Sequence, residues 1–167
     1  MSEFDYYPVF MDWLRQCGNE LVVREVRPPS CGGLEFDIIG ARKLKNRKNF
    51  YALTSIEVKE LDFAKCYRQA WERLSWCEYC YMAFPVNFGE FSNLGRIIYN
   101  LTKYLEKLRK YGIGILVYEN VCAKKVWCVL EARMSDKIMK WRKDMLLDVM
   151  GLRQQKLDTS ITAIKKT

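Results

Sequence analysis

Three charged residues in apolar segments have the types and spacing of a phosphodiester-hydrolysing site. Glu57 and Lys59 lie two residues apart, and Asp37 lies 20 residues before Glu57. In a β-strand, residues i and i+2 point to the same face, so we expect Glu57 beside Lys59 and Val58 opposite. If a neighbouring strand brings Asp37 alongside, the two carboxylates can hold Mg²⁺ or Mn²⁺ while the lysine orients or deprotonates a water. The alternative is a same-face pair of charges on a half-exposed strand.

The elements that must position these residues follow from hydrophobic periodicity. The pattern predicts, in order, a helix over 7–17, strands over 21–26, 34–41 and 50–59, a helix from about 62, a strand over 79–84 stopped by Pro85, a helix over 94–111, strands over 113–118 and 126–131, and a helix after 135. This order predicts an α/β three-layer sandwich with a central mixed β-sheet flanked by helices. The first three strands suit an antiparallel meander, and the helix after the third requires a parallel crossover.

Length and composition narrow the function further. A chain of 167 residues, half of them hydrophobic, suits a single domain over 1–167. The 28 Lys and Arg against 20 Asp and Glu give a net charge of +8, which favours a polyanionic partner such as nucleic acid. The absence of histidine excludes Ser-His-Asp and Cys-His catalysis and mixed Cys/His zinc sites. Carboxylates, lysine, tyrosine, cysteine and metal-bound water remain as general bases.

With these elements in place, the residues resemble the PD-(D/E)XK nuclease superfamily, whose restriction-endonuclease-like core has the order α-β-β-β-α-β. The match covers about 7–85, and the extra helix, two strands and C-terminal helix over 94–155 form an extension. Asp37 is similar to the first metal ligand, Glu57 to the second and Lys59 to the catalytic lysine. Phe36 stands where the motif has its proline.

The resemblance implies a metal-dependent deoxyribonuclease. Asp37, Glu57 and the backbone carbonyl of Val58 would bind Mg²⁺ or Mn²⁺. Some branches add a glutamine on the following helix, which is similar to Gln69. Others, including archaeal Holliday junction resolvases, add a glutamate near the first helix, and Glu25 is the better of two candidates here because its strand should neighbour that of Asp37. The alternative for Glu25 is a surface or salt-bridged glutamate.

The overall length, charge and arrangement resemble small archaeal or archaeal-virus Holliday junction resolvase-like nucleases, which are commonly dimers. This implies a homodimer and a structure-specific cut, with branched or single-stranded DNA as candidate substrates. An acidic N-terminus without a long apolar core is unlike a secretory signal, and no apolar run reaches the length of a bilayer span. We therefore expect an intracellular, cytoplasmic protein with no membrane partner, including a viral protein in its host cell.

Basic residues are candidate DNA contacts. The segment 42–49 is expected to be a hairpin loop and holds five of them, which are Arg42, Lys43, Lys45, Arg47 and Lys48. Three more are expected on the exposed face of the next helix, namely Lys65, Arg68 and Arg73. They would make non-specific phosphate contacts, or the loop is simply solvated.

Aromatic and cysteine residues leave further alternatives open. Five aromatic residues either stack bases of a single strand or fill the core, namely Tyr99, Tyr104, Tyr111, Trp127 and Trp141. Seven cysteines include one Cys-x-x-Cys, at Cys77 and Cys80, with no second pair to complete a zinc site. Disulfides stay possible. The competing functions are a non-catalytic nucleic-acid-binding protein on the same fold, and a structural or regulatory dimer that meets an acidic protein.

Overall fold

A computed structural model describes residues 2–29, 31–45, 50–86 and 91–152. In these ranges the chain forms one short 3-10 helix, four α-helices and six strands. In chain order they are η1 (Glu3–Tyr6), α1 (Tyr7–Gln16), β1 (Leu21–Val26), β2 (Phe36–Lys43), β3 (Tyr51–Val58), α2 (Phe63–Arg73), β4 (Tyr79–Val86), α3 (Phe91–Tyr111), β5 (Gly114–Glu119), β6 (Lys125–Leu130) and α4 (Lys140–Val149). The predicted α/β class is therefore confirmed, as one six-strand mixed sheet packed against four helices.

Strand order in the sheet follows chain order, β1-β2-β3-β4-β5-β6. The first three strands pair antiparallel, and β3 and β4 pair parallel across α2. The predicted meander and the crossover are thus both confirmed. Strand β5 continues parallel to β4, and β6 returns antiparallel at the edge.

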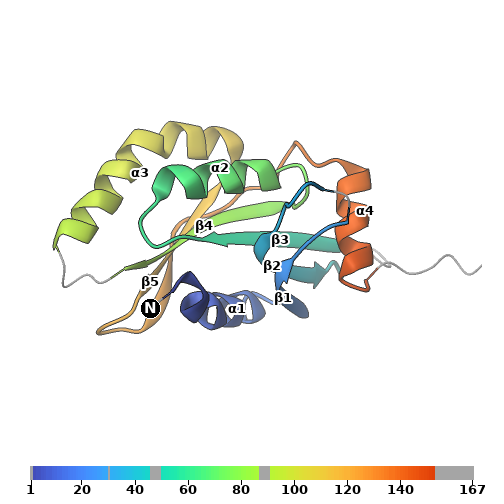
Figure 1. The fold of residues 1–167 in the computed structure, drawn as a ribbon, viewed down its shortest axis with the longest axis horizontal. Helices are drawn as coiled ribbons and strands as arrows, with labels where there is room; N and C mark the ends of the chain where they lie inside the picture. Colours follow the sequence, from blue (N-terminus) through green and yellow to red (C-terminus); the bar gives the residue numbers. More distant parts are fainter. Residues whose placement is uncertain (1, 30, 46–49, 87–90, 153–167) are drawn as a thin grey trace, which may run out of the picture.

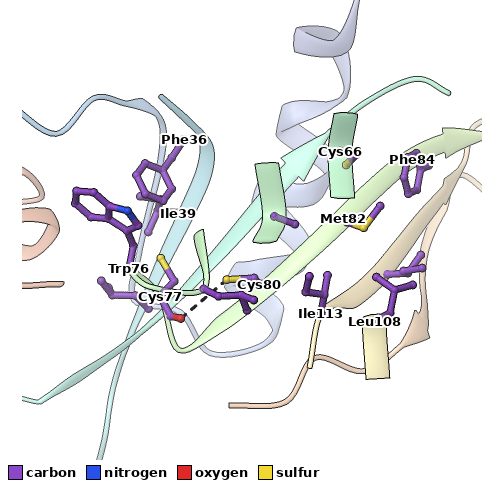
Figure 2. Close-up of a cluster of buried hydrophobic side chains, with 14 of the residues drawn as sticks. Phe36, Ile39, Cys66, Trp76, Cys77, Cys80, Met82, Phe84, Leu108 and Ile113 are labelled. Atoms are coloured by element: carbon purple, nitrogen blue, oxygen red, sulfur yellow. Dashed lines mark hydrogen bonds between the residues drawn. The ribbon is translucent and has the colours of Figure 1, made fainter. Parts of the chain in front are cut away.

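Helices lie on both faces of the sheet, with α1 on one face and α2 and α3 on the other, while α4 lies at one end (Figure 1). Side chains of α1 pack with Ile38, Ile56 and Val58, which alternate with residues facing α2. The larger cluster faces α2 and α3, and Figure 2 shows its aromatic and sulfur-containing members, including Trp76 and Cys77. The four central strands are therefore buried on both faces, as their apolar sequences predict, while the edge strands β1 and β6 are largely exposed or partly buried.

Three predicted boundaries and one predicted burial were wrong. Pro85 does not stop β4, because the strand continues to Val86 and a proline one residue from the end removes only one ladder donor. Arg42 and Lys43 extend β2 and pair with β3 instead of lying in a loop. Helix α4 begins at Lys140, since the chain from 131 to 139 follows an irregular path. Trp71, expected on the buried face of α2, is 44% exposed.

The cysteines form no disulfide, and three of them contribute to the hydrophobic core. All seven are free, and Cys66, Cys77 and Cys80 are buried in the larger cluster. Burial raises the pKa of the Cys80 thiol to about 12, so it stays protonated in the apolar core.

In the described ranges, no helix has the length and apolar character needed to cross a bilayer.

Candidate active site

Asp37 and Glu57 lie at neighbouring positions of β2 and β3. Ile38 pairs with Ile56 in the antiparallel register, and one residue further along each strand are Asp37 and Glu57. The expectation that a neighbouring strand brings Asp37 alongside the Glu57-x-Lys59 segment agrees with this register. The two carboxyl groups nevertheless have different partners, and the difference defines two parts of the site.

The first part is the lysine cluster, formed by Lys59, Asp37, Glu3 and the carbonyl of Val58. The ammonium of Lys59 lies 2.7 Å from the Val58 carbonyl oxygen, 2.8 Å from Glu3 Oε2 and 3.4 Å from Asp37 Oδ2. Strand β3 ends at Val58, so the alternation expected to place Lys59 beside Glu57 no longer applies to its side chain. The side chain of Lys59 therefore contacts Asp37 and Glu3 instead of Glu57.

Asp37 is held by two further donors. Its Oδ2 accepts a hydrogen bond from the backbone N–H of Val58 at 2.8 Å, and its carboxylate is hydrogen-bonded to the Tyr7 side chain. Burial and the negative charge of Asp37 raise the pKa of the Tyr7 phenol, which therefore stays protonated and donates. These donors fix the orientation of Asp37 from α1 and from β3.

The second part is the buried pair of Glu57 and Arg73. Arg73 Nε donates to Glu57 Oε1 at 2.9 Å and a terminal nitrogen to Oε2 at 3.3 Å, while the same terminal nitrogen donates to the Glu35 carbonyl at 2.6 Å. Glu57 is 0% and Arg73 2% exposed. Burial raises the pKa of Glu57 to about 8, although the guanidinium of Arg73 acts to lower it.

The prediction that Arg73 lies on the exposed face of α2 was therefore wrong. Phe63, Cys66, Ala70 and Arg73 recur at helical spacing and are all buried. The guanidinium also lies 4.7 Å from the ring centroid of Phe36, which adds a cation–π contact. The helical spacing of these four residues was the sequence signal for this burial, but the positive charge of Arg73 favoured its assignment to the surface.

Gln69 lies near Asp37, as the resemblance implies. Together with Asp37, Arg73 and Glu72 it lines a cavity of about 380 Å³. Its Oε1 is buried and has no hydrogen-bond partner among the described residues. An unpartnered acceptor at this cavity is available to a ligand that donates a hydrogen bond.

Glu25, the glutamate expected near the first helix, lies on β1, which pairs with the strand of Asp37. Its backbone has φ 54°, its side chain is partly exposed, and it pairs with Arg24 at 3.4 Å, which is the salt-bridged alternative. Glu3, on η1 directly before α1, is the one that reaches Lys59. The hydrogen bond from Ser2 N to Asp5 at 2.7 Å fixes this first turn, and the Ser-x-x-Asp spacing was the sequence signal that could have found it.

Five predicted phosphate contacts are exposed, namely Arg42, Lys43, Lys45, Lys65 and Arg68. The other two loop residues, Arg47 and Lys48, lie outside the described residues. Of the five aromatic side chains left open, three are exposed and two are partly buried. The exposed ones are Tyr99, Trp127 and Trp141. Most of the predicted cationic surface is thus available to a polyanion.

A divalent cation suits one part of the site better than the other. In the lysine cluster, two carboxylate oxygens and a carbonyl oxygen converge on one cationic group, and such oxygens are the ligands of Mg²⁺ and Mn²⁺. Asp37 and the Val58 carbonyl therefore fit a cation, whereas both oxygens of Glu57 are bonded to Arg73. Within the described residues, no group of three or more Cys, Asp or Glu side chains is arranged to hold a metal ion.

Comparison with known proteins adds no relative. No protein-family model matches the chain, and no curated protein sequence matches it.

Proposed function

We propose that this protein is a Mg²⁺- or Mn²⁺-dependent nuclease that hydrolyses DNA phosphodiester bonds on a restriction-endonuclease-like core. The observation that carries the proposal is the convergence of Asp37, Lys59 and the Val58 carbonyl at the end of β3, with Glu57 at the neighbouring position. The element order α1-β1-β2-β3-α2-β4 supports it, because this is the order of the superfamily core. A homodimer and a branched substrate are parts of the proposal that rest on the resemblance alone.

In this mechanism Lys59 acts as a charged group. Burial lowers its pKa, but the hydrogen bond to Glu3 and the charge of Asp37 outweigh burial and raise the pKa above its ordinary value. A protonated ammonium offsets charge on a phosphate and orients a water molecule, and it does not remove a proton. Asp37 and the Val58 carbonyl would hold the cation, with Glu57 as a further ligand once it leaves Arg73. When bound, such a cation supplies a Lewis acid for the phosphate.

The non-catalytic alternative has one observation in its favour. Glu57 has 0% exposure, and Arg73 occupies both of its oxygens. A carboxyl that never leaves this pair cannot bind a metal, and the chain would then bind nucleic acid without cutting it. The two functions differ in whether Glu57 exchanges partners.

A cleavage assay on single-stranded, duplex and four-way-junction DNA tests the proposal, with Mg²⁺, with Mn²⁺ and with chelator. We expect cleavage with either cation and none with chelator. Asp37→Asn should lower the rate by at least about 100-fold, the loss typical when a charge-stabilising group is removed, and leave DNA affinity within about twofold. Asp12→Asn is the matched control, because Asp12 is exposed on α1 and pairs with Arg15.

The assay separates the two candidate functions. Cleavage by the wild type that Asp37→Asn does not reduce would overturn the proposed site. DNA binding without cleavage under every cation condition would favour the non-catalytic alternative. Glu57→Gln, compared with Glu106→Gln on the exposed face of α3 as its control, tests whether the buried carboxyl takes part in cleavage.

A further inference from the structure

A second cavity, of about 560 Å³, adjoins the candidate active site between α2 and the segment that leads into α4. It shares the lining residues Cys31, Leu34 and Glu72 with the cavity that Asp37 and Gln69 line, so the two cavities lie side by side. Its volume lies in the range of about 300 to 1,000 Å³ that is usual for small-ligand sites. A ligand bound at Asp37 can therefore extend into this second cavity.

Aromatic surface and positive charge meet in this second cavity, which we call the tryptophan cavity after Trp71 and Trp76. Trp71 is 44% exposed, while Trp76 is buried beneath Arg142. The guanidinium of Arg142 lies 5.3 Å from the ring centroid of Trp76 and 5.1 Å from that of the exposed Trp141. Lys137 supplies a second cation to the lining. Bases stack on exposed aromatic rings, and phosphates bind to neighbouring guanidinium and ammonium groups.

One hydrogen-bond donor of the tryptophan cavity, Nε of Arg142, is available to a ligand. One terminal nitrogen of Arg142 donates to Ser75 Oγ, while its buried Nε has no hydrogen-bond partner among the described residues. The acid of the lining, Glu72, has its carboxylate 3.4 Å from Arg73 and is thereby paired. The cavity therefore offers a donor and unpaired positive charge to a ligand with acceptor oxygens or nitrogens.

We infer that the tryptophan cavity binds an unpaired nucleotide of the DNA strand whose phosphate lies at Asp37, with the base stacked on Trp71. This rests on the proposed function and narrows its substrate to single-stranded or branched DNA. A base inside a duplex is already stacked and paired, so it enters such a cavity only after extrusion, which costs a few kcal/mol. Arg142 and Lys137 contact the acceptors of the base or its flanking phosphate.

A second copy of this chain is the competing occupant of the apolar lining. Arg142 and Lys137 make this face cationic, so the approach of a second copy with a formal charge of +8 is opposed at this face, whereas a nucleic acid strand neutralises it. Charge complementarity favours the nucleic acid.

The test measures the affinity of full-length Asp37→Asn protein for labelled oligothymidylate and for a duplex of equal length, in chelator. Adding Trp71→Ala should weaken single-strand binding by about 5- to 150-fold, as expected for the loss of one stacked base, and duplex binding by less than about twofold. Trp71→Phe should restore most of the affinity because it keeps a π-face. Val129→Ala is the control, since Val129 is 50% exposed on β6 and lines neither cavity.

An equal loss of affinity for both DNAs, or no loss, would overturn the inference. So would a dimer that Trp71→Ala dissociates in sedimentation while oligonucleotide affinity is unchanged. Failure of the proposed function is distinguishable, because the wild type would then cleave nothing with either cation while Trp71→Ala still weakened single-strand binding selectively. Thermal unfolding of each variant confirms that it is folded.

Discussion

Two sets of charges meet at the end of β3, and they are built differently. The pair of Glu57 and Arg73 is sealed from solvent, and each group satisfies the other. In the lysine cluster, Asp37 and Lys59 reach the surface through Glu3, whose side chain is 36% exposed. The sealed pair resembles a structural link between α2 and the sheet, whereas the lysine cluster can exchange partners at low cost.

This difference indicates the order in which a ligand can engage the site. Asp37 has backbone and tyrosine donors that remain if Lys59 moves, so releasing the ammonium does not leave the Asp37 carboxylate without a partner. Releasing Glu57 leaves the buried Arg73 guanidinium with the Glu35 carbonyl and the more distant, half-exposed Glu72 carboxylate, which is costly. We therefore expect a cation or a phosphate to engage Asp37 and Lys59 first and Glu57 last.

The strongest way to break this comparison is to remove Arg73. Arg73→Leu should lower the free energy of unfolding by about 3 to 5 kcal/mol, because it leaves the Glu57 carboxyl buried without its partner. Chemical denaturation measures the effect, and Arg68→Leu on the exposed face of α2 is the control. The double variant Glu57→Met/Arg73→Met should recover much of the loss. A loss below about 1 kcal/mol for Arg73→Leu would show that the pair is not a structural link.

Removing Lys59 should cost less. Lys59→Met loses hydrogen bonds to charged groups and leaves Asp37 still bonded to Val58 N–H and Tyr7, so we expect a loss of about 1.5 to 3 kcal/mol. Denaturation under the same conditions measures it. If Lys59→Met destabilised the protein more than Arg73→Leu, the two sets of charges would have the opposite roles.

The pH dependence of stability sharpens the comparison for Glu57. Burial raises its pKa from the ordinary 4.5 to about 8, so in that window the folded protein keeps a proton that the unfolded chain releases. The free energy of unfolding should therefore fall as pH rises, by at most about 1.4 kcal/mol per pH unit. The measured quantity is the difference between wild type and Glu57→Gln across the window. A difference independent of pH contradicts the prediction.

The smallest effect belongs to Glu3. Glu3→Gln should change the free energy of unfolding by less than about 1 kcal/mol, because its partly exposed ion pair with Lys59 is screened by solvent. It should also lower the pKa of Lys59, since the hydrogen bond to Glu3 is one of the causes that raise it. NMR titration of the lysine ammonium in wild type and variant measures this shift. An unchanged pKa would remove Glu3 from the cluster.

Local periodicity was enough to predict most of the fold. Apolar alternation and helical spacing predicted the four α-helices and six strands but not η1, and the helix between the third and fourth strands predicted the parallel pairing. The errors concern residues whose positions are determined by contacts between elements that are distant in the sequence. Arg73 was assigned to the surface because lysine and arginine are seldom buried, and only the Glu57 carboxyl across the interface explains its position. Glu3 is 56 residues from Lys59, beyond any local rule.

The sequential strand order has a consequence for how the protein is made. Each strand pairs with the one before it in the chain, so pairing proceeds without waiting for distant segments. Both sets of charges lie within the first 73 residues, from Glu3 in η1 to Arg73 in α2. A nascent chain therefore holds every group of the site while β5 and β6 are still unsynthesised, and those later strands extend an assembly that already has its charged residues.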